Sequence, residues 1–269
     1  MKISLFTSNN HRHNYFINLL SNYCDELWVV QECRTLFTAK NDLNYQKSNV
    51  IEEYFDKVTK AQNKFFKREF VNKNCRNIKT LPILNGELNR LSLSYLNDFL
   101  KSDIYVVFGA SFIKGELVDF LVKQKAINIH AGVSPYYRGC DCNFWALYDG
   151  NPNLVGSTIH LLSKGLDSGP ILYHAMSNLR TNHFEYTMST IKSAFYSITE
   201  RINDGSIFNI KPIDQDRSKE IRYSRRIEFN EKVVSDYLEM NINLNKVKFD
   251  SSSLKEPFFL NDWKLKILL

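Results

Sequence analysis

Two polar side chains at the end of an apolar run, and one carboxylate further along the chain, are suited to act on a carbonyl group. Asn128 and His130 stand one residue apart at the end of a predicted strand, 126–130, so their side chains leave the same face. An amide beside an imidazole can polarise a carbonyl and stabilise the oxyanion that forms when a nucleophile attacks it. Asp167 lies in the glycine-flanked loop 165–169, and a carboxylate brought to the imidazole could relay a proton.

Each of these features also has a simpler explanation. An Asn-x-His at a strand end commonly has its polar groups satisfied by the surrounding fold. An Asp between glycines is typical of a turn. Taken one at a time, neither feature establishes a site, so the order and the spacing of the neighbouring motifs decide.

Four motifs occur within residues 128–172 in the order and at the spacing of one known family. They are Asn128-Ile129-His130, Pro135-Tyr136-Tyr137-Arg138-Gly139, Gly156-Ser157-Thr158-Ile159-His160 and Leu166-Asp167-Ser168-Gly169. In these motifs the chain resembles the formyltransferases that use 10-formyltetrahydrofolate. The resemblance extends weakly over residues 1–205. It implies an α/β, Rossmann-like formyltransferase domain with a mostly parallel sheet.

The resemblance also implies the roles of particular residues. Asn128, His130 and Asp167 would be catalytic, in direct attack of an amine on the formyl carbon through a tetrahedral intermediate, with 10-formyltetrahydrofolate as the formyl donor and no metal. The loop after the predicted strand 104–108 would wall the folate slot. We therefore predict Ser111, Phe112 and Ile113 as cofactor contacts, with plain loop packing as the alternative.

Three further features near these motifs are ambiguous. Arg138 is predicted to bind an anionic group of the substrate, and it could equally brace its own loop by bonding backbone carbonyls. His160 is expected to be a satisfied core histidine rather than a catalytic one. Cys140 and Cys142 form a single Cys-x-Cys without a second pair, which does not indicate a metal site.

The branches of the formyltransferase family that this chain resembles differ in the amine that accepts the formyl group. Chain length, a short C-terminal tail and the stretch Leu84-Asn85-Gly86-Glu87-Leu88-Asn89 look like the sugar N-formyltransferases. We therefore predict transfer to an amino sugar linked to a nucleotide, as in polysaccharide biosynthesis. Formylation of methionyl-tRNA is the first alternative. A folate or nucleotide binding module would not need the three polar residues, and a formyltetrahydrofolate hydrolase usually carries an additional N-terminal domain.

The amino-acid composition limits the classes of protein to which this chain can belong. The 269 residues are 43% hydrophobic and 24% charged, an ordinary globular composition that excludes wholesale disorder. No apolar run is long enough to span a membrane, the N-terminus lacks a signal peptide, and the five scattered cysteines favour a reducing compartment, so we expect a cytoplasmic protein. The net charge of +6 is concentrated in residues 60–79 and 215–226. We expect these runs to be solvated faces or anion contacts, and the partner to be a small molecule rather than a nucleic acid or a membrane.

Short apolar runs alternate with longer stretches of helical period, which predicts an α/β sheet. Strands are predicted at 3–7, 26–31, 78–83, 104–108, 126–130, 157–162 and 171–175. Helices are predicted at 12–22, 48–73, 88–101, 116–124, 143–148 and 185–203. Beyond residue 212 the pattern is irregular. We divide the chain into a catalytic domain, 1–205, and a small C-terminal appendage, 206–269, for acceptor binding or for formation of a homodimer.

Overall fold

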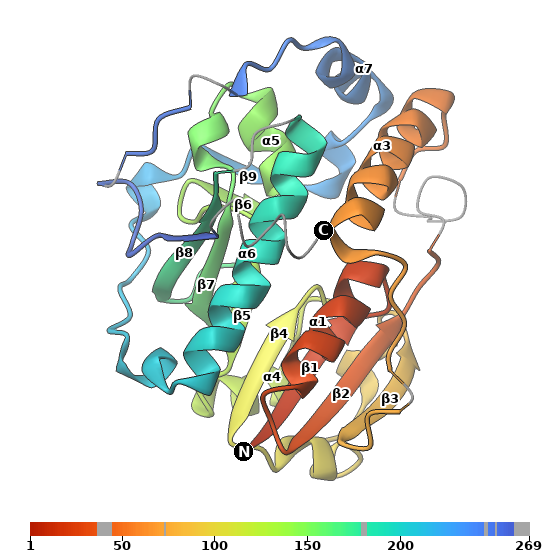
Figure 1. The fold of residues 1–269 in the computed structure, drawn as a ribbon, viewed down its shortest axis with the longest axis vertical. Helices are drawn as coiled ribbons and strands as arrows, with labels where there is room; N and C mark the ends of the chain where they lie inside the picture. The colour runs from red at the N-terminus through yellow and green to blue at the C-terminus, as the bar shows by residue number, and fades with distance from the viewer. Residues whose placement is uncertain (37–44, 73, 179–181, 245–246, 251, 261–269) are drawn as a thin grey trace.

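A mostly parallel sheet of eight strands forms the centre of the structure, a computed structural model that describes residues 1–36, 45–72, 74–178, 182–244, 247–250 and 252–260 (Figure 1). Lys73 of the first basic run, and residues 245–246, 251 and 261–269 of the predicted appendage, lie outside the described residues. The strand order is β10-β8-β7-β5-β4-β1-β2-β3. The α/β class predicted from the sequence is confirmed.

The strands of this sheet are β1 (Lys2–Ser8), β2 (Glu26–Cys33), β3 (Ile78–Leu84), β4 (Ile104–Phe108), β5 (Ile127–His130), β7 (Ser157–Leu161), β8 (Ile171–Ser177) and β10 (Phe258–Leu260). From β3 to β5 every neighbouring pair is parallel, and β7 then runs antiparallel to both β5 and β8. All five residues of β4 are buried, as expected for a central strand that is covered on both faces.

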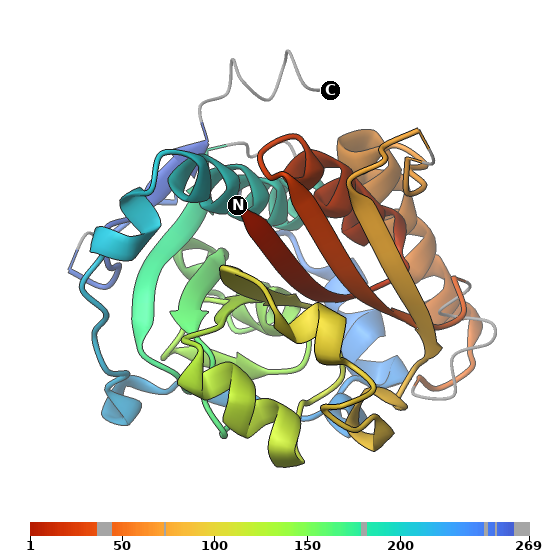
Figure 2. The same ribbon diagram turned by 90° about the horizontal axis from the view of Figure 1, so that it is seen from below.

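Helices cover both faces of the sheet (Figures 1 and 2). The helices α1 (His11–Ser21), α3 (Asn49–Phe66) and α6 (His183–Asn203) lie on one face, and α4 (Gly115–Lys123) lies on the other. Short 3₁₀ turns connect the elements, at Leu88–Arg90, Asn97–Leu100, Pro152–Leu154, Ser206–Asn209, Arg217–Lys219 and Arg226–Glu228. Among the described residues, no helix is both long and apolar enough to cross a membrane.

The helix predicted at 88–101 is wrong. The structure has two 3₁₀ turns there, separated by an irregular stretch. The Ser92 hydroxyl accepts a hydrogen bond from the Tyr95 N–H, and such local side-chain bonds compete with the helical ladder. The leucines that gave the stretch its helical period are still used, because Leu88 and Leu96 pack in the same apolar cluster as Leu117 of α4.

The C-terminal segment packs closely against the rest of the chain. Its strand β9 (Arg222–Ser224) pairs with β6 (Tyr137–Gly139) in a second, two-stranded sheet, and β10 extends the main sheet beside β8. The helix α7 (Glu231–Glu239), which the sequence analysis missed, begins after Asn230, whose side chain accepts from the Val233 N–H. It shares an apolar cluster with α5 (Cys142–Tyr148). The division at residue 205 stays a prediction.

The core between α1, α6 and the sheet offers a test of the packing. Phe195 of α6 stacks on Phe16 of α1, with ring centroids 4.4 Å apart, and meets the edge of Phe108 of β4 at 4.9 Å. Phe195→Ala should lower the free energy of unfolding by about 3–5 kcal/mol, because it removes contacts and leaves a cavity. Phe208→Ala, at a 66% exposed position, should change it by less than about 0.5 kcal/mol in the same denaturant titration. Equal losses in the two variants would contradict this packing.

Candidate active site

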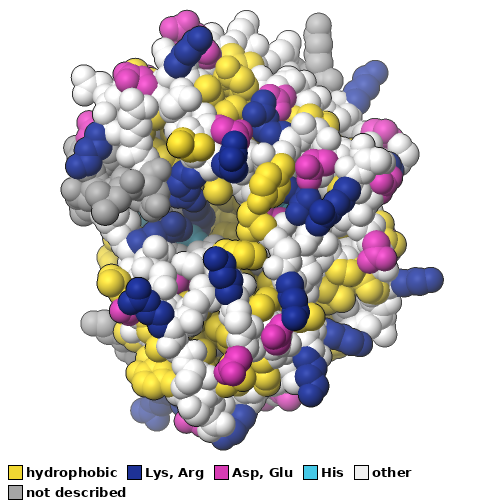
Figure 3. All heavy atoms as spheres, turned by 180° about the vertical axis from the view of Figure 1, so that it is seen from behind, with side chains coloured by type: hydrophobic (Ala, Val, Ile, Leu, Met, Phe, Trp, Pro, Cys, Tyr) yellow, Lys and Arg dark blue, Asp and Glu magenta, His cyan; other side chains and the backbone are white. Residues whose placement is uncertain are grey.

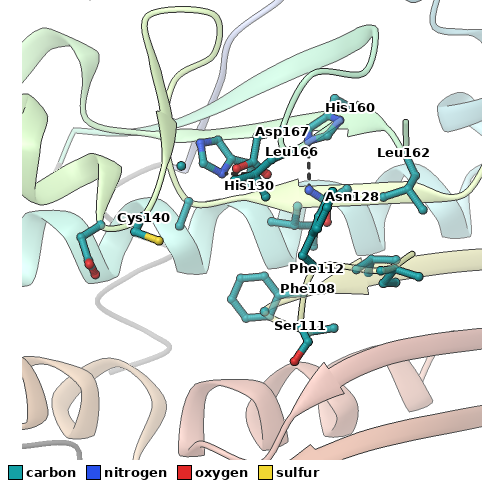
Figure 4. A pocket seen from close by; sticks show the side chains of 18 of the residues that line it. Phe108, Ser111, Phe112, Asn128, His130, Cys140, His160, Leu162, Leu166 and Asp167 are labelled. Carbon is teal, nitrogen blue, oxygen red and sulfur yellow. Dashed lines mark hydrogen bonds and ion pairs between the residues drawn. The ribbon is translucent and has the colours of Figure 1, made fainter. Parts of the chain in front are cut away.

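A cleft of about 290 Å³ opens at the carboxyl ends of the central strands, where open α/β sheets bind their ligands. Asn128 and His130 of β5, His160 of β7 and Asp167 from the loop after β7 all line it (Figure 4). Seen from outside, Lys and Arg side chains gather around a hollow with an imidazole inside (Figure 3). The structure thus brings together the three residues that the sequence predicts to be catalytic, and adds His160.

Asn128 is oriented by His160. The two residues stand opposite each other on the antiparallel strands β5 and β7, and Asn128 Nδ2 lies 2.9 Å from His160 Nε2 (Figure 4). The other ring nitrogen, Nδ1, donates to the Leu161 carbonyl at 2.8 Å, so Nε2 accepts from the amide. Burial lowers the pKa of His160 to about 4, which keeps the ring neutral. His160 is buried and satisfied, as expected, and it also fixes which way the Asn128 amide points.

His130 lies between Asp167 and a backbone carbonyl. Its Nδ1 is 3.3 Å from Asp167 Oδ1, and its Nε2 is 3.2 Å from the Tyr137 oxygen. Both side chains are largely buried, with 7% and 11% of their surface exposed, so little water competes for this pair. Gly132 leaves room for the ring, since a Cβ there would lie 2.6 Å from His130 Nε2. The geometry suits a ring that exchanges a proton with the carboxylate.

The Asp167 loop is held from behind by Arg138. The guanidinium is 6% exposed and donates to the Asp167 oxygen at 3.2 Å and to the Leu166 oxygen at 2.7 Å. Its remaining nitrogen, Nη1, pairs with Glu220 at 2.7 Å. Arg138 does not line the cleft. The guanidinium is occupied by the loop and Glu220, and these contacts fit the bracing alternative. The substrate contact predicted for Arg138 stays a prediction.

The loop after β4 has its own brace. The Ser111 N–H donates to Glu32 Oε2 at 2.5 Å, and the Gly86 N–H donates to Glu32 Oε1 at 2.9 Å. Glu32 is 1% exposed, and no sequence motif marked it. Ser111, Phe112 and Ile113 all line the cleft, with Phe112 43% exposed and Ile113 buried. Their predicted contact with folate stays a prediction.

Arg12, Arg34 and Asp141 line the cleft, and none of them was predicted from the sequence. Arg226 also lines it and belongs to the second basic run, for which anion contacts were one of the two expectations. The signal for Arg12 and Arg34 was their position just after the first two predicted strands. Cys140 also lines the cleft. Within the described part of the chain, no group of three or more His, Cys, Asp or Glu side chains could hold a metal ion.

Comparison with known protein families finds a match over part of the chain. Residues 92–200, which include Asn128, His130 and Asp167, match the family model described as formyl transferase. Over these residues the chain is similar to the formyl transferases.

Individual relatives match over limited stretches. The methionyl-tRNA formyltransferase of Thermosynechococcus vestitus is 37% identical over 73 residues, 27% of this chain and 22% of that protein. The bifunctional polymyxin resistance protein ArnA of Wigglesworthia glossinidia brevipalpis is 30% identical over 119 residues, 44% of this chain and 16% of that protein. The crystal structure of a 4-N formyltransferase from Francisella tularensis is 18% identical, with a TM-score of 0.49 over 88% of this chain and 86% of that one. The chain spans less than half the length of the first curated relatives it matches.

The brace at Glu32 predicts a measurable change in the loop it holds. Glu32→Gln replaces one acceptor oxygen by an NH₂ group that faces a backbone N–H, and charged hydrogen bonds of this kind contribute about 1.5–3 kcal/mol. Amide exchange at Gly86 or Ser111, followed by NMR, should therefore accelerate at least about tenfold. The matched variant Glu53→Gln, on an exposed stretch of α3, should leave both amides unchanged. Unchanged protection in Glu32→Gln would contradict the bracing role.

Two buried histidines predict how stability depends on pH. Burial lowers the pKa of His160 and of His174 to about 4, against 6.5 for an exposed ring. Between pH 6.5 and pH 4 the unfolded chain therefore binds protons that the folded protein does not, and the free energy of unfolding falls as the pH falls. The loss should be of the order of 2 kcal/mol per histidine between pH 7 and pH 5.

Denaturant titrations at the two pH values measure this loss, and His174→Gln isolates one contribution. His174 Nε2 donates to the Ser134 oxygen at 2.9 Å and Nδ1 accepts from the Lys255 N–H at 2.8 Å, and Gln supplies one donor and one acceptor without titrating. The variant should lose less stability on acidification than the parent. An identical loss in both proteins would show that His174 does not take part.

Proposed function

We propose that this protein transfers the formyl group of 10-formyltetrahydrofolate to the primary amine of an amino sugar. The observation that carries the proposal is the meeting of Asn128, His130 and Asp167 in one cleft of a formyl transferase domain. An oriented amide, an imidazole and a carboxylate together meet the needs of acyl transfer to an amine: oxyanion stabilisation and proton transfer.

Each of the three residues has a separate role in the proposed reaction. The Asn128 amide, oriented by His160, donates a hydrogen bond to the formyl oxygen as it becomes negative. The His130 ring donates a second one through Nε2, which exchanges the Tyr137 oxygen for the substrate. Asp167 takes part in removing the proton that the attacking amine loses, directly or through His130, which it contacts at 3.3 Å, and in returning a proton to the folate nitrogen as the bond between that nitrogen and the formyl carbon breaks. The acceptor reacts as a free amine, because an ammonium group has no lone pair. We assign no step to a metal.

The walls of the cleft fit a folate. When bound, 10-formyltetrahydrofolate supplies the formyl group as the electrophile. Phe108, Phe112, Leu162 and Leu166 give the cleft apolar and aromatic walls beside Asn128 (Figure 4), suited to a flat ring system. The loop 109–113 exposes backbone groups there and is held by Glu32 and by Asn89, whose side chain bonds the Phe112 oxygen and the Lys114 N–H.

Two observations favour a small acceptor. The site lies inside a cleft whose volume is of the order found for small-molecule sites. The two basic runs also make ion pairs within the protein: Lys64 pairs with Glu185, Arg222 with Asp149 and Arg225 with Glu228. Charges engaged in this way are poorly placed to track the phosphates of a nucleic acid.

Methionyl-tRNA is the second candidate acceptor, because several curated relatives are named methionyl-tRNA formyltransferases. One experiment separates the candidates. The protein and 10-formyltetrahydrofolate are incubated with a panel of amino sugars, free and nucleotide-linked, and in parallel with methionyl-tRNA, and the products are analysed by mass spectrometry. Gain of one formyl unit on an amino sugar supports the proposal. If only the methionyl group is formylated, methionyl-tRNA and not an amino sugar is the acceptor. If no amine is formylated, the proposed activity is wrong.

Removing any of the three proposed catalytic groups should impair turnover without unfolding the protein. Loss of one oxyanion donor typically costs ~100- to 1,000-fold in turnover, and proton transfer contributes ~100- to 10,000-fold. Asn128→Ala, His130→Ala and Asp167→Ala should each lower kcat at least about 100-fold, and the losses should not add, since the groups act on one intermediate. Steady-state kinetics with circular dichroism as the folding check measure this.

The matched control is Asp56→Ala, which removes an exposed carboxylate of α3 far along the chain from the site. It should keep the parent kcat. A His130→Ala protein with near-parent turnover would remove the central residue of the mechanism.

A further inference from the structure

The cleft contains a second set of charged residues that the proposed chemistry does not use. Arg12 lies in the first turn of α1, Arg34 follows β2, and Arg226 follows β9. Three arginines that are far apart in the sequence therefore line the same cleft. All three side chains are half-buried. Figure 3 shows dark blue side chains around the hollow on this face.

One half-buried carboxylate stands among these arginines. Asp141, the residue before α5, interacts electrostatically with Arg226, Arg12 and Arg34. Its backbone is in the left-handed region, at φ 55°, a conformation that residues with a side chain adopt rarely and often at functional sites. Asp167, the other carboxylate of the cleft, is engaged by His130. Around Asp141 the described residues therefore hold more positive than negative charge.

The arginine set is not fully satisfied by the described part of the chain. Arg12 Nε and Asp141 Oδ2 are buried, and neither makes a hydrogen bond to a described residue. Arg12 does contact Gln62 Oε1 through Nη1 at 3.1 Å, and Arg34 Nε donates to Ser8 Oγ at 3.2 Å. Burial and the neighbouring Arg34 lower the pKa of Arg12 to about 10. Crowded, partly desolvated cations of this kind are stabilised by an anion bound between them.

We propose that Arg12, Arg34 and Arg226 form a binding site for a phosphoryl group of the acceptor, the diphosphate of a nucleotide-linked amino sugar. Guanidinium groups present paired N–H donors that match phosphate oxygens, and three of them can bind two phosphoryl groups. Asp141 holds the guanidiniums in place. The inference rests on the proposed function, and places the anionic part of the acceptor in the cleft that holds the catalytic residues.

Binding of simple phosphates tests the site without requiring turnover. Isothermal titration calorimetry of the full chain with inorganic phosphate, inorganic pyrophosphate and UDP compares the parent protein with Arg12→Gln, Arg34→Gln and Arg226→Gln. Each substitution should weaken pyrophosphate and UDP binding by about 10- to 100-fold, the usual effect of losing a charged hydrogen bond. Tighter binding of pyrophosphate than of phosphate supports a diphosphate; equal binding would reduce the group to a single phosphate and contradict the diphosphate assignment.

Two controls make the result decisive. Arg217→Gln removes an exposed arginine outside the cleft and should bind pyrophosphate as the parent does. The affinity for 5-formyltetrahydrofolate, a folate that does not donate its formyl group here, should be unchanged in all four variants. Arg226 sits on a short 3₁₀ turn, so its variant tests the site even if Arg12→Gln fails to fold.

The outcomes separate this inference from the proposed function. Absence of pyrophosphate and UDP binding by a parent protein that binds the folate, or equal binding by the folded variants, overturns the phosphate site even if an amino sugar is formylated. Arginine-dependent pyrophosphate binding with no formyl transfer to any amine leaves the site intact and overturns the activity. Binding of a short RNA that depends on the three arginines, without binding of pyrophosphate, would also overturn the small-molecule site.

Discussion

The guanidinium of Arg138 is the contact on which the arrangement of the site depends. It is buried, and it joins the backbone of the Asp167 loop to Glu220, which comes 82 residues later in the chain. A buried charge is costly unless it is paired and hydrogen-bonded, and here three of its nitrogens have acceptors. The Asp167 loop is therefore held in the position in which its backbone oxygens accept hydrogen bonds from the Arg138 guanidinium. That position brings Asp167 to His130, because Arg138 lies on β6, directly after the segment that carries His130.

The reversal of direction between β5 and β7 makes the rest of the site possible. In an antiparallel pair, residues directly opposite each other bring their side chains close together, and Asn128 stands opposite His160. Since β5 follows the parallel order of β1 and β4, its carboxyl end also meets Ser111, in the loop after β4, and Arg12, in the first turn of α1. The site thus lies where the parallel part of the sheet meets its antiparallel part.

The sequence predicted the strands well where a short apolar run is buried over most of its length. The strands β1, β2, β4 and β5 fall within two residues of their predicted bounds, because each is a short apolar run. The stretch 88–101 failed since its leucines pack on α4 without forming a helix, and serine side chains satisfy the backbone instead. Asn128, His130 and Asp167 were recognisable from motif spacing. Glu32 and Arg12 were not, because their importance comes from contacts with segments that only the fold brings near.

The C-terminal segment connects the two halves of the site. Gln215 Nε2 bonds the backbone oxygens of Asp167 and Gly169, Glu220 pairs with Arg138, and Arg226 reaches the cleft beside Asp141. The same twelve residues, 215–226, thus brace the loop of the proposed proton-transfer group and supply a charge to the proposed acceptor site. A change in this segment that adapts the cleft to a different acceptor also acts on the Asp167 loop. The proposed acceptor site and the Asp167 loop are therefore physically connected through residues 215–226.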